Sequence, residues 1–453
     1  MDAPSPDRFR TLQVDGHRPT VASQNRALVA AATAHLADVH RSQCTDQTPV
    51  LFARMDCHGL GEDLNQAVRM FAVAVSQRRQ LVLLPPAPEE ARDPKGCALP
   101  ASIRLSAAEP WHWLAGQSMP IDSILVTSSC QKYLQQRHPM VMEAVAQSGV
   151  GNATQVAEQL GAKMLAAASR ESQSLWRSHL AVSKHVPRIF QRQGLLWWFQ
   201  VLTTYLVRIQ SPLAERLQAH PAMKPFAFQT PQSPVDEFRW LGWTVRCGRK
   251  YCDGLGPGWR PTARFDIGAH IRIGDSCRQK NVPKHYLLHV RRCDLNLSTV
   301  VRKIRASGLH NGTLFIASDS QAIIEEVARG GARPFTASYL SINRTRFDTA
   351  IPTEQLDLKR ERMRSLVEAL MDMLLISRSS LVVGKMMSNF PRMALQLRTQ
   401  LPRSQRAGAY VSLDDRPWCS RTSCREGYLD KETWVAATKK ELRRNPPLEN
   451  DEI

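Results

Sequence analysis

The chain has 453 residues and carries 60 Lys and Arg against 41 Asp and Glu, a formal net charge of +19. Its 43% hydrophobic and 22% charged residues are typical of a globular protein and exclude collagen, a coiled coil and wholesale disorder. The excess of cations predicts an anionic partner, which could be nucleic acid, a membrane surface, a phosphate ligand or an acidic polymer.

The first half of the chain predicts an α/β unit. A helix rich in Ala and Leu is expected at 24–40. Apolar runs at 49–55 and 81–86 fit buried strands, and apolar residues at helical spacing predict a helix at 63–78 between them. Strand, helix and strand in this order form a βαβ unit. A long helical region at 155–218 follows.

The second half repeats this alternation after a Pro- and Gly-rich segment at 254–262. Strands are predicted at 265–273, 312–320 and 379–385, and helices at 287–305, 321–329 and 366–376. Two blocks of alternating strands and helices predict two Rossmann-like domains that face a cleft. The expected divisions are an N-terminal extension, an N-terminal α/β domain with a helical insertion, a C-terminal Rossmann-like domain and a basic tail, at 1–48, 49–245, 255–420 and 421–453.

Polar side chains gather where the three strands of the second half end. These residues are His270, Arg272, Asp275, Asp319, Ser388 and Asn389. In open α/β sheets, ligands bind at the carboxyl ends of the strands. An Arg fork suits phosphate oxygens, and a helix that starts at Ser388 favours an anion. Structural alternatives are a salt bridge for Arg272 and a helix cap for Asp319, but three such loops at one edge favour a binding site.

The cysteines and asparagines bear on the compartment. Two close pairs, Cys247 with Cys252 and Cys419 with Cys424, are compatible with disulfides or free thiols, and less readily with structural zinc. Four glycosylation sequons lean towards a secretory lumen; they begin at Asn152, Asn296, Asn311 and Asn343. The first residues resemble neither a signal nor a transit peptide. We therefore expect a Golgi or other luminal protein if a leader was removed, and a cytosolic one if Met1 is the native start.

The strand-end motifs resemble those of the GDP-fucose-dependent fucosyltransferase superfamily, which includes α1,6-fucosyltransferases and protein O-fucosyltransferases. HIRIGD at 270–275 is similar to their H-x-R motif, and LWWFQVLTTYLVRIQSPL at 196–213 to a helix of the α1,6 enzymes. Later α1,6 motifs are similar to three further segments of this chain: YLLHV at 286–290, IASDS at 316–320 and the segment 370–394. CHGLGEDLNQA, which ends at Ala67, resembles the G-N-Q-A turn of the O-fucosyltransferases.

The resemblance implies a GT-B fold and an inverting fucosyl transfer from GDP-fucose to a glycan or glycoprotein, without cofactor or metal. Arg272 would hold the β-phosphate and offset the charge that grows on the departing diphosphate. The implied contacts are diphosphate or fucose for His270, Tyr286, Ser388 and Asn389, and guanine or ribose for Asp319 and Asp372. The implied acceptor-side residues are Gly59, Gly61 and Asn65.

The chain departs from the α1,6 pattern at three positions. Where the α1,6 enzymes have a second Arg, this chain has Ile273, and where they have a Lys and a Glu, it has Ser276 and Lys280. The catalytic base is therefore open between Asp275, the nearest carboxylate, and the leaving phosphate itself. We expect neither the SH3-like domain of animal core enzymes after the catalytic region nor a coiled coil before it. The leading expectation is α1,6 transfer to a core N-glycan or chitooligosaccharide.

Alternatives are protein O-fucosylation and a catalytically weak homologue that binds GDP-sugar or glycan. A nucleic-acid partner is not expected, because the basic residues are scattered and lack interleaved aromatics. The acceptor, the linkage and the oligomeric state stay open.

Overall fold

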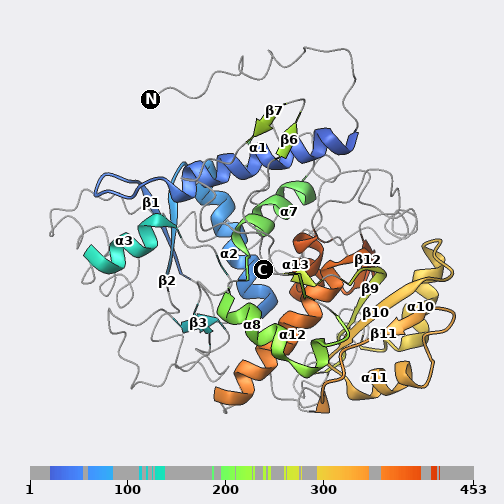
Figure 1. The fold of residues 1–453 in the computed structure, drawn as a ribbon. Helices are drawn as coiled ribbons and strands as arrows, with labels where there is room; N and C mark the ends of the chain where they lie inside the picture. The colour runs from blue at the N-terminus through green and yellow to red at the C-terminus, as the bar shows by residue number, and fades with distance from the viewer. Residues whose placement is uncertain are drawn as a thin grey trace, which may run out of the picture.

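The computed structural model describes residues 21–54, 60–84, 112–114, 119–120, 125, 128–137, 186–187, 195–209, 211–226, 228–229, 238–240, 243–245, 260–261, 263–274, 277, 293–345, 359–398, 410–415 and 418. Within these residues the fold is α/β, with parallel sheets in two separate parts of the chain (Figure 1). The predicted α/β class with parallel sheets is thereby confirmed. The finer prediction, a GT-B arrangement of two domains that face a cleft, stays a prediction.

The first part is the predicted βαβ unit, preceded by α1 (Val21–Arg41). Strands β1 (Val50–Arg54) and β2 (Gln80–Leu84) pair in parallel, and α2 (Leu60–Ser76) connects them. Nearly every residue of α2 is buried, polar ones included. This helix is therefore covered on several sides.

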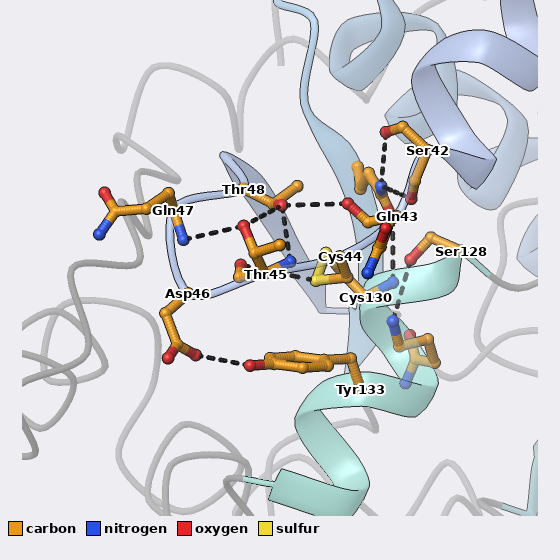
Figure 2. The surroundings of a disulfide bond; sticks show 12 residues. Ser42, Gln43, Cys44, Thr45, Asp46, Gln47, Thr48, Ser128, Cys130 and Tyr133 are labelled. Atoms are coloured by element: carbon orange, nitrogen blue, oxygen red, sulfur yellow. Dashed lines mark hydrogen bonds between the residues drawn. A yellow bond between two sulfur atoms is a disulfide. The ribbon is translucent and has the colours of Figure 1, made fainter.

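A disulfide joins Cys44, just before β1, to Cys130 in α3 (Ser129–Arg137) (Figure 2). We call it the long-range disulfide, since 86 residues separate its cysteines. Around it, Gln80 accepts a hydrogen bond from the Cys130 amide at 2.9 Å, and the Ser128 hydroxyl donates to the Leu81 carbonyl at 2.7 Å. These bonds fix α3 beside β2. The sequence had not indicated this pairing.

The helical region that follows is described in part. Helices α7 (Leu195–Leu206) and α8 (Ser211–Ala219) and a 3-10 helix at Pro221–Met223 fall within or just after the predicted 155–218. Most of α7 is buried, as its apolar sequence requires. Three short antiparallel pairs complete this part: β3 (His112–Leu114) with β4 (Met119–Pro120), β5 (Phe228–Gln229) with β8 (Arg260–Pro261), and β6 (Phe238–Trp240) with β7 (Trp243–Val245).

The second part contains a five-stranded parallel sheet in the order β11-β10-β9-β12-β13. The strands are β9 (Phe265–Ile271), β10 (Thr313–Ser318), β11 (Thr336–Ser338), β12 (Ser379–Gly384) and β13 (Tyr410–Ser412). The helices are α10 (Leu297–Ala306), α11 (Gln321–Ala328), α12 (Lys359–Ser377) and α13 (Asn389–Leu397). The two edge strands were not predicted, since each is only three residues long.

Two boundaries differ from the prediction. Helix α10 starts at Leu297, because the side chain of Asn296 caps it by accepting from the Thr299 amide at 2.9 Å. Residues 287–292 of the predicted helix lie outside the described residues. Helix α12 starts at Lys359, earlier than the 366 expected.

A second disulfide, here called the short-range disulfide, joins Cys277 to Cys293 across a separation of 16 residues. The pairs Cys247/Cys252 and Cys419/Cys424 lie outside the described residues.

One apolar cluster contains residues of both parts, and a second cluster lies within the second part. Side chains of β10 alternate between two clusters: Phe315 packs into a cluster with α2, α7, α12 and α13, and Ile316 into a cluster with α10 and α11. Figure 1 shows the small sheet on one side, the larger sheet on the other, and α2, α7 and α13 between them. No helix within the described segments is long and apolar enough to cross a bilayer.

Candidate functional site

The candidate site lies at the carboxyl edge of the five-stranded sheet. Strand β9 occupies the middle, with β10 and β12 on its two sides, and His270 is in register with Ala317 on one and Gly384 on the other. The loops after these three strands therefore start next to one another. The sequence prediction that they share an edge is confirmed.

His270 is buried in surroundings that disfavour its charged form. It is 6% exposed, and its ring stacks on that of Phe390, with the centroids 4.3 Å apart. Burial lowers the pKa of His270 well below its usual value, and the cations Arg272, Lys385 and Arg344 lower it further. Its Nδ1 is buried and has no hydrogen-bond partner among the described residues. Buried polar atoms are normally paired, so a ligand atom is a natural partner for this nitrogen.

The start of α13 offers a positive helix end. Ser388 is the N-cap residue in an extended conformation, but its side chain makes no capping hydrogen bond. Asp414, which follows β13, fixes the loop before α13. It accepts hydrogen bonds from the amides of Met386 and Met387, both at 2.8 Å, and from the Ser412 hydroxyl at 2.7 Å. The first amides of α13 thus lack the usual Ser cap while their loop is fixed. This arrangement suits an anion.

Asp319 and Asp372 contact the protein in this structure. Asp319 Oδ1 accepts from the Ile273 amide at 2.8 Å, so it ties the end of β10 to the loop after β9. Asp372 is buried on α12 and accepts two hydrogen bonds from Arg344, at 2.8 and 3.2 Å. Burial raises the pKa of Asp372, and Arg344 opposes this rise. Their contacts with guanine or ribose stay predictions.

The two described residues expected on the acceptor side lie against α13. A Cβ added at Gly61 would be 2.9 Å from the Phe390 nitrogen, so the backbone of α2 approaches that of α13 as only glycine allows. Asn65 donates to the Gly61 carbonyl at 2.7 Å and to the Asn389 carbonyl at 3.1 Å, and accepts from Gln396 at 2.9 Å. These residues therefore connect the first part of the chain to the start of α13. An acceptor-side role stays a prediction.

Gly59, Asp275 and Tyr286 lie outside the described residues. Sequence reasoning missed Arg344, Lys385 and Asp414. Lys385 directly follows β12 and could have been found by its place at a strand end, as Arg272 was. Arg344 and Asp414 stand in no pattern that distinguishes them. In the part of the chain that is described, no group of three or more His, Cys, Asp or Glu side chains is placed to hold a metal ion.

Solved structures of fucosyltransferases are similar to this chain over most of its length. An α1,6-fucosyltransferase NodZ soaked with GDP-fucose matches with a TM-score of 0.32 and 16% identity, over 77% of this chain and 92% of that one. POFUT1 in complex with GDP matches with a TM-score of 0.37 and 12% identity, over 82% of this chain and 100% of that one. A mutant FUT1 of Arabidopsis thaliana in complex with GDP matches with a TM-score of 0.36 and 11% identity, over 86% of this chain and 81% of that one.

No protein-family model matches the chain. No curated protein matches it either. At such low TM-scores and identities, similarity to solved structures does not by itself decide the donor, the acceptor or the activity. The function must be argued from the site residues.

Proposed function

We propose that the chain is an inverting, metal-independent fucosyltransferase that moves fucose from GDP-fucose to a glycan acceptor. The observation that carries the proposal is the convergence of Arg272, buried His270 and the uncapped start of α13 at one sheet edge. An Arg, a hydrogen-bonding imidazole and a helix N-terminus are three groups that suit a diphosphate.

The proposed chemistry is a single displacement. The acceptor hydroxyl attacks the anomeric carbon of fucose while the bond from that carbon to the phosphate oxygen breaks. Negative charge then grows on the diphosphate, where Arg272 and the dipole of α13 stabilise it more in the transition state than in the ground state. The hydroxyl proton goes to Asp275 or to the leaving phosphate. The charge on Arg272 takes the place that a metal ion fills in other transferases.

The favoured acceptor is one of α1,6 type, a core N-glycan or a related chitooligosaccharide, because most of the resembling motifs are those of α1,6 enzymes. Protein O-fucosylation is the second candidate. One observation supports it: position 273 carries an isoleucine that packs against the cluster containing α10 and α11, so it supplies no second cation. O-fucosyltransferases also tend to have an apolar residue there.

The test is release of GDP from GDP-fucose on an acceptor-glycan array, with mass spectrometry of the product linkage. We expect turnover on a chitobiose-containing glycan and an α1,6 linkage. Turnover only on a folded peptide domain would support the second candidate. GDP binding without turnover on any acceptor would refute catalysis and leave a binding protein.

We further propose a secretory compartment, with the Golgi as the expected site. The long-range and short-range disulfides favour an oxidising environment. Three sequon asparagines are exposed and accessible to a glycan: Asn296, Asn311 and Asn343. Expression in a eukaryotic cell should give a protein whose mass falls on treatment with peptide N-glycosidase. A protein of unmodified mass with free thiols would contradict this localisation.

A further inference from the structure

Lys385 is a buried lysine at the candidate site that the proposed chemistry does not use. It directly follows β12, the neighbour of β9, and is 5% exposed. Its ammonium group donates to the Arg272 carbonyl at 2.6 Å and lies 3.8 Å from Cys277 Sγ in the short-range disulfide. Lysine is rarely buried to this extent unless it is paired. The side chain therefore reaches across the end of β9 instead of into solvent.

The peptide unit after Arg272 is held at both ends. Its oxygen, the Arg272 carbonyl, accepts from Lys385, and its nitrogen, the Ile273 amide, donates to Asp319 Oδ1 at 2.8 Å. One peptide group is thus hydrogen-bonded at both ends to charged side chains: Lys385 donates to its oxygen, and Asp319 accepts from its N–H. Hydrogen bonds with ionised groups are the stronger kind. These two bonds fix the backbone from which the Arg272 side chain extends.

We propose that Lys385 is a positioning residue for Arg272: together with Asp319 it orients the Arg272–Ile273 peptide so that the guanidinium is preorganised for a diphosphate. This positioning role rests on the proposed function, because a GDP-sugar transferase gives Arg272 a diphosphate to bind. Lys385 itself need not touch the ligand. Preorganisation of this kind improves affinity by lowering the cost of ordering the site.

The charges around Lys385 agree with this role. Burial lowers its pKa to about 8. Asp319, Asp414 and Asp294 raise the pKa, from the segments after β10, after β13 and before α10, and Arg272 after β9 lowers it. Lys385 also lowers the pKa of His270 on β9. The ammonium is thus protonated at neutral pH and loses its charge as the pH rises through about 8.

A double-mutant cycle with GDP as the probe tests the proposal. Calorimetry at pH 7 would measure GDP affinity for the wild type, Lys385→Met, Arg272→Ala and the double variant. We expect Lys385→Met to weaken GDP binding about 10-fold, and to change it by less than about twofold when Arg272 is already Ala, because Lys385 acts through that residue. The matched control is Lys303→Met. Lys303 also donates to backbone carbonyls and pairs with an aspartate at 2.6 Å, but on α10. It should leave GDP affinity unchanged.

A second readout does not depend on the Met variant folding. In the wild type, GDP affinity should fall between pH 7 and 9, while Lys385→Arg, which keeps its charge, should bind GDP with little change over this range. Equal pH dependence in the two proteins would overturn the proposal. So would additive losses in the cycle, because they would mean that Lys385 acts independently of Arg272.

The outcomes separate this role from the proposed function. If the wild type does not bind GDP, the proposed function is wrong and the role of Lys385 falls with it. If Arg272→Ala abolishes binding and Lys385→Met matches the wild type, the proposed donor site stands and the positioning role is wrong. Faster hydrogen exchange at the Ile273 amide in Lys385→Met would support the fixing of this peptide group by Lys385.

Discussion

The contact between α2 and α13 leads to a prediction for Asn65→Ala. Asn65 is fully buried, and its side chain makes three hydrogen bonds to described residues: it donates to the Gly61 and Asn389 carbonyls and accepts from Gln396. At about 1 kcal/mol per bond, their loss costs about 3 kcal/mol. Alanine returns about 0.6 kcal/mol through its better helix propensity. We therefore expect the free energy of unfolding to fall by about 2 kcal/mol.

The same substitution should weaken GDP binding about 5-fold, because the Asn389 carbonyl that Asn65 holds belongs to the first residue of α13. Urea unfolding gives the stability and calorimetry the affinity. The matched control is Gln131→Ala, which removes two buried bonds to Leu83, at 2.8 and 3.3 Å, within the first part of the chain. It should cost about 2 kcal/mol and leave GDP affinity intact.

Two results would refute this reasoning. One is an Asn65→Ala protein within about 0.5 kcal/mol of the wild type, the range of an ordinary surface change. The other is an equal loss of GDP affinity in Gln131→Ala, because that would make the effect one of general destabilisation. Either result would remove α2 from the support of the site.

Three further predictions concern stability. Gly61→Ala should destabilise by about 1 kcal/mol or more, because the clash with α13 outweighs the helix propensity of Ala; a more stable protein in urea would contradict the close approach. Replacing both cysteines with Ser should cost about 4.6 kcal/mol for the long-range disulfide and about 3.1 kcal/mol for the short-range one, since their loops differ in length; the reverse order in urea unfolding would contradict this. Because the folded-state pKa of Lys385 lies below that of the unfolded chain, the unfolded state binds more protons between pH 8 and 10.5. The wild type should therefore gain up to roughly 3 kcal/mol relative to Lys385→Met as the pH rises through this range, and a constant difference would argue against the lowered pKa.

The sequence was informative where a signal is local. The apolar runs that became β9, β10 and β12 are strong enough to predict buried parallel strands, and parallel strands place their carboxyl ends together. Ser388 followed by Pro391 predicted the start of α13, which begins at Asn389. These signals sufficed to bring His270, Arg272 and the α13 start to one edge.

The sequence was uninformative where a partner is distant. Arg344 and Asp372 lie 28 residues apart, and Lys385 lies 113 residues from Arg272, so no periodicity relates them. Charge type alone could not tell that Asp319 binds a backbone amide. The three-residue edge strands carry too few residues for a period-two pattern and form because the sheet is already there.

The central claim is that Arg272 and its neighbours bind the diphosphate of a GDP-sugar, and GDP affinity in Arg272→Ala tests it most directly. The control is Arg302→Ala, because Arg302 is exposed on α10 of the same sheet domain and its loss lowers the net charge of +19 by the same amount. We expect calorimetry to show GDP binding about 100-fold weaker in Arg272→Ala and unchanged in Arg302→Ala. Equal affinities in all three proteins, or equal losses in both variants, would contradict a specific diphosphate site at this sheet edge.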